Sequence, residues 1–402
     1  MRIGILTYYR VPNFGANLQA ISTYYCLKKL GHEVVFLNYA SPRTRFIQSR
    51  VSSNRQVQAH FDFIDKYIPN QTKVLSTSLA VKKEILLRQL DAVIIGSDAV
   101  TQHHPLFSTL KLSNLSMYWL MPLEPERRFP NAFWGYRFAG KIPTAMMSVS
   151  SQNSPYKSFS AITNHFMGNL LGKMRYISTR DEWTRDMMLN ANNSLHIEIT
   201  PDPVFALNEN AKEIIPTETD IRSKFNLPEK YVLVGLRSQS LTLEQMSELD
   251  NLLNHEGLSC VSFPVDIIKS YKHPFKYSID EPISPLEWFG LLKYASAYVG
   301  SNMHPIVSCL TNGVPCYSLD NWGTTDFWGH KKECASSKVF DVLHQYGLEG
   351  NRSQIELGKC YVKMEHIVNM LHSYPKENVL GISRKRYKSY CKMIDNIISS
   401  LK

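Results

Sequence analysis

The sequence has few cysteines and no long apolar run, and both absences narrow its class. Seven cysteines are scattered along the chain, at Cys26, Cys260, Cys309, Cys316, Cys334, Cys360 and Cys391. Their number is odd, no two form a C-x-x-C pair and none has zinc-ligand spacing with histidine, so we expect neither a disulfide framework nor a metal site. No stretch approaches the roughly 20 apolar residues that span a bilayer, and the apolar run Ile3–Leu6 is too short for a signal peptide. We therefore expect a cytoplasmic protein whose membrane contact would be peripheral, at the inner face of the membrane.

Glycine and proline are also sparse, with 19 and 20 among 402 residues, while 44% of the residues are hydrophobic. Such a composition excludes a collagen-like or disordered chain, and the length favours two domains. The net charge of +10 favours anionic partners such as phosphates, acidic glycans or a membrane surface. Nucleic acid is the least expected partner, because the basic residues are scattered and no nucleic-acid-binding motif is present.

Apolar runs that end in polar or glycine-containing turns alternate with helical patterns. Such runs occur at 3–7, 34–37, 91–98, 144–149 and 176–179, and again at 231–237, 258–263, 297–299 and 314–317. This alternation predicts an α/β fold of two Rossmann-like domains that face a cleft. We expect an N-terminal domain at 1–207, a connector at 208–228, a C-terminal domain at 229–375, and a C-terminal helix at 376–402 that could cross back.

One segment has a pattern typical of an anion site. The apolar residues 297–299 are followed by Gly300-Ser301, a helix is expected to begin near Asn302, and Gly313 stands where that helix would end. His304 then lies in the first turn, where free N–H groups and the helix dipole favour a phosphate and an imidazole could transfer a proton. The alternative is a histidine whose ring is simply satisfied by its neighbours.

Several short motifs, in order along the chain, resemble those of the polysaccharide pyruvyl transferase family. Residues 13–20 read Asn-Phe-Gly-Ala-Asn-Leu-Gln-Ala, which is similar to the family's opening motif. The Gly-Ser-Asp at 96–98, Ser-Thr-Arg-Asp at 178–181 and Asp-Pro at 202–203 follow, and residues 303–306 with 312–315 resemble the carboxyl-terminal Arg-x-His motif. Each match is weak alone, but the ordered set is fairly specific.

The resemblance implies a GT-B-like pair of domains and transfer of pyruvate from phosphoenolpyruvate, as co-substrate without a further cofactor, to a sugar. The product would be a ketal on a surface polysaccharide or its lipid-linked precursor, as in bacterial capsule or exopolysaccharide. Such a donor needs cations or amide donors for its phosphate and carboxylate, and an acid to protonate its methylene carbon. His304 is the candidate for proton transfer, with Ser301, Asn302 and Met303 at the helix start holding phosphate.

Strand ends supply the other candidates on the donor side. Arg180 and Arg237 could clamp an anion, because guanidinium pairs with phosphate and carboxylate in two-point geometry. The alternative for Arg180 is a structural ion pair with Asp181 or Glu182. Asp98 could act as base toward an acceptor hydroxyl, or it could cap a following helix.

The first loop carries the candidates for the acceptor. Asn13, Gly15 and Gln19 could hold sugar hydroxyls or shape the turn, and Gly15 permits close backbone approach. After a later strand, Trp322, Phe327 and Trp328 could stack on a sugar or pack locally. In the basic C-terminal segment, Arg384, Lys385, Arg386 and Lys388 could meet anionic lipid headgroups or form a solvated helix face.

The sequence departs from the family pattern at Asn302, which stands where the family has arginine. A fixed positive charge is therefore missing, and either Arg237 or a lysine such as Lys331 substitutes for it, or donor binding is weakened, or the donor differs. Two other functions stay open: a GT-B glycosyltransferase that uses a nucleotide sugar, and a non-catalytic binding protein that has lost the donor site.

Overall fold

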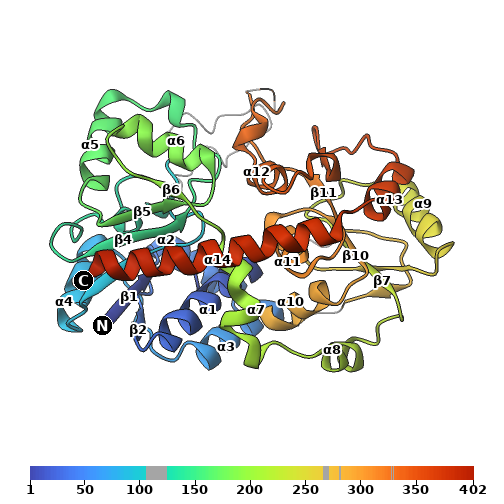
Figure 1. Ribbon diagram of the computed structural model, residues 1–402, viewed down its shortest axis with the longest axis horizontal. Coiled ribbons are helices and arrows are strands. Elements are labelled where there is room, and N and C mark those ends of the chain that lie inside the picture. Colours follow the sequence, from blue (N-terminus) through green and yellow to red (C-terminus); the bar gives the residue numbers. More distant parts are fainter. Residues whose placement is uncertain (106–124, 266–270, 280–281, 327, 329) are drawn as a thin grey trace.

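The computed structural model describes residues 1–105, 125–265, 271–279, 282–326, 328 and 330–402. They form two parallel sheets of six strands each, with helices packed around both (Figure 1). The predicted α/β fold with two Rossmann-like halves is confirmed. Phe327, one of the candidate stacking residues, lies outside the described residues. No described helix is both long and apolar enough to cross a bilayer.

The first sheet has the strand order β2-β1-β3-β4-β5-β6, and neighbouring strands pair in parallel. Alternate residues enter two different cores: in β3, Ile94 packs on one face of the sheet and Val93 and Ile95 pack on the other. A strand buried on both faces needs apolar residues throughout, which explains the continuous apolar runs. The strands are β1 (Arg2–Leu6), β2 (Glu33–Phe36), β3 (Ala92–Ile95), β4 (Thr144–Val149), β5 (Tyr176–Thr179) and β6 (Glu198–Ile199).

The helices described in this half connect its strands. They are α1 (Phe14–Lys29), α2 (Pro42–Val51), α3 (Arg55–Tyr67), α4 (Ser78–Leu87), α5 (Ala161–Leu171) and α6 (Glu182–Ala191). Three of them, α2, α3 and α4, lie between β2 and β3, a stretch to which the sequence pattern assigned no element. Two helices, α7 (Leu207–Asn210) and α8 (Glu218–Phe225), lead to the second half.

The second sheet has the order β12-β11-β10-β7-β8-β9 and is also parallel. Its strands are β7 (Tyr231–Gly235), β8 (Ser259–Ser262), β9 (Tyr277–Ser278), β10 (Ala297–Gly300), β11 (Cys316–Asp320) and β12 (Arg352–Gln354). Its helices are α9 (Leu243–Asn254), α10 (Pro285–Lys293), α11 (Met303–Asn312), α12 (Lys338–His344) and α13 (Met364–His372).

A single C-terminal helix, α14 (Lys376–Leu401), crosses from the second half back to the first (Figure 1). At 26 residues it is about 39 Å long. Near its start, Ser383 donates a hydrogen bond to the Leu310 carbonyl of α11 (2.7 Å); near its end, the Met393 sulfur accepts one from Ser148 of β4 (3.1 Å). The helix therefore ties the second half, through α11, to the first sheet, and it crosses back as the sequence suggested.

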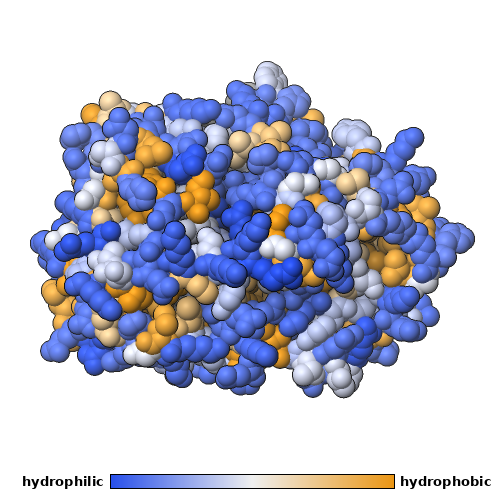
Figure 2. All heavy atoms as spheres, in the orientation of Figure 1, coloured by the Kyte–Doolittle hydropathy of each residue, from blue (hydrophilic) through white to orange (hydrophobic). Residues whose placement is uncertain are grey.

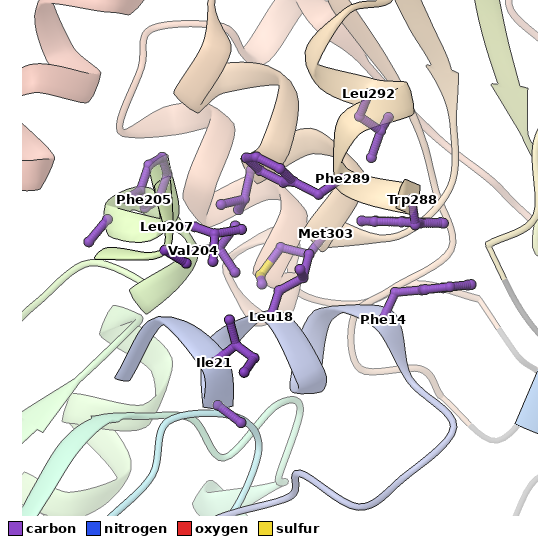
Figure 3. Packing of buried hydrophobic residues seen from close by; sticks show 14 of the residues in the cluster. Phe14, Leu18, Ile21, Val204, Phe205, Leu207, Trp288, Phe289, Leu292 and Met303 are labelled. Atoms are coloured by element: carbon purple, nitrogen blue, oxygen red, sulfur yellow. The ribbon is translucent and has the colours of Figure 1, made fainter. Parts of the chain in front are cut away.

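The two halves also share a hydrophobic core, which Figure 3 shows around α1, the 203–207 turn and α10. Phe14 at the start of α1 stacks on Trp288 of α10, with ring centroids 5.0 Å apart and planes 7° apart. Leu18 and Ile21 continue this face along α1, and Met303 of α11 packs into the same cluster. The start of α1 is thereby held against the second half.

A polar contact adds to this interface and gives a direct test of its contribution. The buried side chain of Gln56 in α3 donates to the Ile283 carbonyl (2.8 Å) and accepts from the Ile283 N–H (2.7 Å). We expect Gln56→Ala to lower the free energy of unfolding by about 1–3 kcal/mol, because two buried backbone groups lose their partner. Urea denaturation measures this. Gln58→Ala, an exposed change on the same helix, should stay within about 0.5 kcal/mol of the wild type; equal effects would contradict the assignment.

Candidate active site

A pocket of about 150 Å³ lies at the carboxyl ends of the strands, between the two halves. Seven of the ten predicted site residues line it, whereas Ser301, Arg180 and Gln19 lie outside the lining. Residues of both halves form its walls. The first half contributes Pro12, Asn13, Phe14, Gly15 and Asp98, and the second contributes Arg237, Val265, Trp288, Asn302, Met303, His304, Pro305, Trp322 and Lys338.

The turn from β10 into α11 forms one side of the pocket. Ser301 is buried there: its N–H donates to the Gly235 carbonyl (2.7 Å), and its Oγ has no partner among the described residues. Asn302 adopts φ +77° and ψ 153°, and its side chain donates to the Val265 carbonyl (3.2 Å). Such a backbone costs a non-glycine residue on the order of 1–3 kcal/mol, so the departure from arginine coincides with a strained position.

His304 occupies the first turn of α11, as predicted, and its ring is placed by Gly15 of α1. A Cβ atom on Gly15 would lie only 2.0 Å from His304 Nδ1. Any side chain at position 15 would therefore displace the imidazole. In this structure the group that approaches Gly15 closely is a histidine of the other half, and contact of Gly15 with an acceptor sugar stays a prediction.

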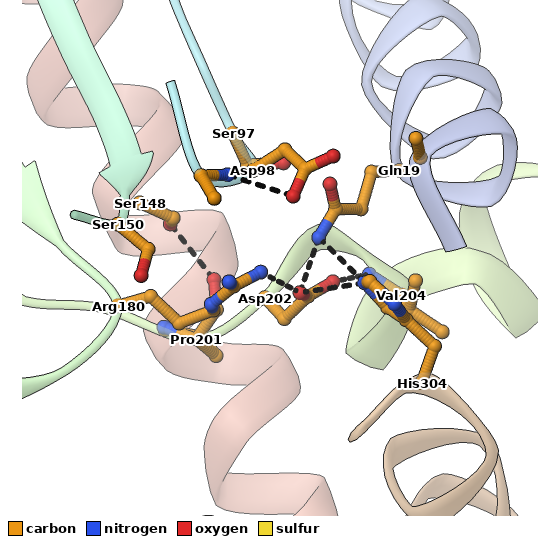
Figure 4. Close-up of polar contacts among 12 residues, drawn as sticks. Gln19, Ser97, Asp98, Ser148, Ser150, Arg180, Pro201, Asp202, Val204 and His304 are labelled. Carbon is orange, nitrogen blue, oxygen red and sulfur yellow. Dashed lines mark hydrogen bonds and ion pairs between the residues drawn. The ribbon is translucent and has the colours of Figure 1, made fainter. Parts of the chain in front are cut away.

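The other edge of the imidazole faces a buried polar cluster (Figure 4). His304 Nε2 lies 3.6 Å from Asp202 Oδ2 and 3.0 Å from Gln19 Nε2. Asp202 Oδ2 also accepts hydrogen bonds from Gln19 Nε2 and from Arg180 Nη1 (2.8 Å). The predicted residues Gln19, Arg180 and His304 are thus brought together by Asp202, whose role sequence reasoning missed.

Asp202 carries a negative charge in this cluster. Burial raises the pKa of its carboxyl, but the contact with His304 and the positive charge of Arg180 outweigh burial and hold that pKa well below its usual range. The carboxylate also faces the Nε2 edge of the His304 ring. In the sequence, the signal for this residue was the Asp-Pro pair after a strand. In the structure, Asp202 also caps the turn that follows, because it accepts a hydrogen bond from the Val204 N–H (2.9 Å).

Arg180 lies behind the pocket rather than in its wall. Its side chain is only 3% exposed, and its ion pair is with Asp202 and not with Asp181 or Glu182. Asp181 caps α6 instead, accepting from the Thr184 N–H (2.7 Å). Arg180 Nε and Nη2 have no hydrogen-bond partner among the described residues. The geometry therefore supports Arg180 as a residue that positions Asp202, and its role as a donor clamp stays a prediction.

The pocket contains a lysine that sequence reasoning did not single out. Burial lowers the pKa of Lys338, and the positive charges of Arg180 and Arg237 lower it further. The carboxylates of Asp98 and Asp320 raise it, and the result is a pKa of about 8. The lysine considered from the sequence, Lys331, donates instead to a backbone carbonyl of its own loop. Lys338 and Arg237 therefore supply positive charge in a pocket whose helix start lacks the family arginine.

Both cations lie over the ring of Trp322. Lys338 Nζ is 3.9 Å and Arg237 Cζ is 4.8 Å from the ring centroid, within the range of cation–π attraction. The buried carboxylate of Asp320, at the end of β11, orders this loop by accepting from the Trp322 N–H (2.8 Å) and from the Ser337 hydroxyl that caps α12. Trp322 thus lines the pocket among cations, whereas Trp328, 64% exposed, lies outside the lining.

Asp98 and Asn13 reach the pocket from the first half. Asp98 accepts from the Ala99 N–H (2.7 Å), and no helix occurs in residues 99–105, so it caps no helix there. Asn13 caps α1 by accepting from the Ala16 N–H (3.0 Å). In the described part of the chain, no three or more His, Cys, Asp or Glu side chains are grouped to hold a metal ion.

Comparison with known proteins agrees with the motifs. The family model described as polysaccharide pyruvyl transferase matches residues 13–323, a range that contains every pocket residue except Pro12 and Lys338. No curated protein gives a significant match to the sequence.

Solved structures share the fold at low sequence identity. The UDP-GlcNAc 2-epimerase from Methanocaldococcus jannaschii is 12% identical, with a TM-score of 0.56 over 99% of this chain and 100% of that chain. The UDP-GlcNAc 2-epimerase from Neisseria meningitidis, bound to UDP-GlcNAc, is 9% identical, with a TM-score of 0.54 over 99% and 100%. A ugt transferase from Siraitia grosvenorii in complex with UDP is 11% identical, with a TM-score of 0.51 over 100% of each chain. These similarities establish the GT-B fold.

The buried ion pair predicts a pH-dependent stability. Asp202→Asn leaves Arg180 unpaired, so we expect it to lower the free energy of unfolding by about 3–5 kcal/mol at neutral pH. Because the folded-state pKa of Asp202 is lowered, its stabilisation is present above the unfolded-state value of about 3.9 and is lost as pH falls below it. The difference between wild type and variant should therefore shrink below about pH 4 in denaturation experiments. Asp62→Asn, at an exposed carboxylate, is the control; a penalty that does not change with pH would contradict the ionised state.

Proposed function

Because this chain belongs to the polysaccharide pyruvyl transferase family, we propose that it transfers a pyruvyl group from phosphoenolpyruvate to two hydroxyls of a sugar, forming a ketal. The observation that carries this proposal is the placement of His304. Its imidazole is wedged between Gly15 and Asp202 at the wall of a pocket that also contains Lys338 and Arg237. A proton donor beside unusually concentrated positive charge suits a donor with both a phosphate and a carboxylate.

The donor would bind between the cations and the start of α11. Where α11 begins, the backbone N–H groups of Met303 and His304 would donate hydrogen bonds to an anion, and the helix dipole favours one there. Lys338 and Arg237 face the same pocket and would pair with the remaining negative charge. Two cations, one after β7 and one at the start of α12, would thus compensate for asparagine at position 302.

Reaction would begin with transfer of a proton from His304 to the methylene carbon of phosphoenolpyruvate. The developing positive charge on the adjacent carbon is then attacked by a sugar hydroxyl, which loses its proton as the C–O bond forms. Phosphate departs with the electrons of its C–O bond, and a second hydroxyl closes the ketal. One hydroxyl proton replaces the proton that His304 gave, and the other leaves with phosphate, so the histidine is restored.

The residues around His304 fit this sequence of steps. Asp202 and Gln19 hold the Nε2 edge of the ring, which leaves Nδ1 for proton transfer. Asp98, on the opposite wall, would accept the proton of one acceptor hydroxyl and pass it to the departing phosphate. We place the acceptor on the side of α1, where Asn13 and Gly15 line the pocket, and the donor on the side of α11.

The acceptor would be a surface polysaccharide or its lipid-linked precursor, handled by a cytoplasmic enzyme at the inner face of the membrane. The competing function is sugar transfer from a nucleotide sugar, favoured by the structural likeness to the ugt transferase with bound UDP. Phosphate release from phosphoenolpyruvate, with a matching mass gain on candidate glycans, distinguishes the two. Consumption of nucleotide sugars alone would refute pyruvyl transfer, and absence of donor binding at millimolar concentration would favour a non-catalytic protein.

His304→Gln tests the proton-transfer step. The variant keeps a polar group near Asp202 but cannot serve as the acid, so we expect turnover to fall about 10²- to 10⁴-fold while phosphoenolpyruvate still binds. Phosphate release measures turnover, and calorimetry measures donor binding. His330→Gln, at an exposed histidine outside the pocket, should retain full activity. Near-normal turnover in the His304 variant would exclude the role.

Lys338→Met tests the source of the missing positive charge. Loss of one charge-assisted contact should weaken phosphoenolpyruvate binding about tenfold to a hundredfold. Because the amine is charged only below its pKa of about 8, the affinity of the wild type should decline as the pH rises past 8, and that of the variant should not. Calorimetry across this range measures both, with exposed Lys332→Met as the control. Unchanged affinity in the Lys338 variant would show that another group holds the donor.

A further inference from the structure

The outer layer of the first half exposes apolar side chains where a water-soluble protein would usually bury them. Five of the twelve large hydrophobic residues exposed in the described chain lie on only two helices: Leu79, Leu86 and Leu87 on α4, and Ile162 and Phe166 on α5. In Figure 2, hydrophobic residues gather at the lower left of the view, where Figure 1 places α4. Clusters of this kind mark interaction sites.

Helical spacing aligns these residues with cations. On α4, Leu79, Lys82 and Leu86 are three and four residues apart and share one face of the helix, while Val81 and Ile85 face the core. On α5, Ile162 and Phe166 are four residues apart, while Met167 and Leu171 are buried. Each helix therefore has a buried apolar face and a second apolar stripe that points outward.

A groove of about 250 Å³ between the two helices joins the stripes. Its lining includes Leu79 and Phe166 and four cations, Lys82, Arg137, Lys141 and Lys173, and it includes no acidic residue. Among the described residues, none of these cations takes part in a salt bridge. We call this face, formed by the stripes and the groove, the α4–α5 surface.

We propose that the α4–α5 surface docks on an anionic phospholipid bilayer. Unpaired lysine and arginine beside exposed leucine, isoleucine and phenylalanine is the combination that binds such a surface: the cations attract lipid phosphates, and the apolar side chains enter the boundary between headgroups and acyl chains. The stem of Lys173 lies over Gly140, and Arg137 Cζ lies 5.2 Å from the centroid of the Tyr136 ring. Their charged ends are thus presented by supported, partly apolar side chains, as in residues that reach toward a membrane interface.

A protein partner would be expected to bring matching carboxylates, whereas a bilayer supplies both negative charge and an apolar layer over a broad area. The four cations and the two outward stripes extend over two helices and a turn, which suits a flat, extended partner. The surface lies on a different element from the basic residues of α14 that the sequence suggested for lipid contact.

The test is sedimentation of the full chain with sucrose-loaded vesicles, either phosphatidylcholine alone or phosphatidylcholine with 30% phosphatidylglycerol. We expect binding to the anionic vesicles that weakens as salt is raised, and at least tenfold weaker partitioning for the triple variant Lys82→Gln/Arg137→Gln/Lys173→Gln. The matched control is Arg384→Gln/Lys385→Gln/Lys388→Gln on α14, which removes the same charge from another exposed face and should bind like the wild type.

A second pair of variants separates insertion from simple charge attraction. Ile162, 84% exposed, changed to glutamate should weaken binding even at low salt, while Leu357→Glu, at an exposed position of the second half, should not. Thermal unfolding confirms that all variants are folded. Failure of the wild type to bind anionic vesicles, or loss of binding in the α14 variant with retention in the groove variant, would overturn the proposal. Because no donor or acceptor is present, either result leaves the test of pyruvyl transfer unaffected.

Discussion

The arrangement of the pocket depends on one buried carboxylate. Asp202 is held ionised by Arg180 and hydrogen-bonded by Gln19, and the same oxygen faces the imidazole of His304. A buried charge is tolerated only when it is fully paired and hydrogen-bonded. The residues that satisfy Asp202 come from α1, the end of β5 and α11, so satisfying this charge also sets where the second half sits on the first. The orientation of the imidazole is therefore a consequence of how the two halves dock.

Packing around the pocket reinforces that docking. Phe14, which stacks on Trp288, immediately precedes Gly15, against which the imidazole of His304 packs. Apolar burial and close approach therefore occur at the same end of α1. On the far side, α14 packs against β4 and β5 of the first sheet and against α11 of the second half, and it shares the interface core. The two halves contribute different groups to the site. The first half supplies a glycine, an amide and carboxylates, and the second supplies an imidazole, an amine and a guanidinium. Neither half contains a complete site.

Much of the fold could be predicted because its strands are buried on both faces and therefore stand out as apolar runs. The strands that were missed, β6, β9 and β12, contain only two or three residues, too few to show a pattern. In the site, His304 and Gly15 were recognisable from local motifs, and the glycine's purpose followed from its lack of a side chain. Asp202 and Lys338 were not assigned, because their roles depend on partners far away in the sequence. Lys338 is also the first residue of a helix of only seven residues, and it matters only because that helix and the loop after β11 bring it to Trp322.

The position of Trp322 has a consequence for how this protein can be observed. An indole with an ammonium 3.9 Å from its ring centre and a guanidinium at 4.8 Å experiences a strong local electric field. Indole emission shifts in wavelength and intensity when nearby charge is moved or neutralised. An anion that drew these two groups toward itself would change that field, so occupancy of the pocket would be visible in the intrinsic fluorescence of the unlabelled chain.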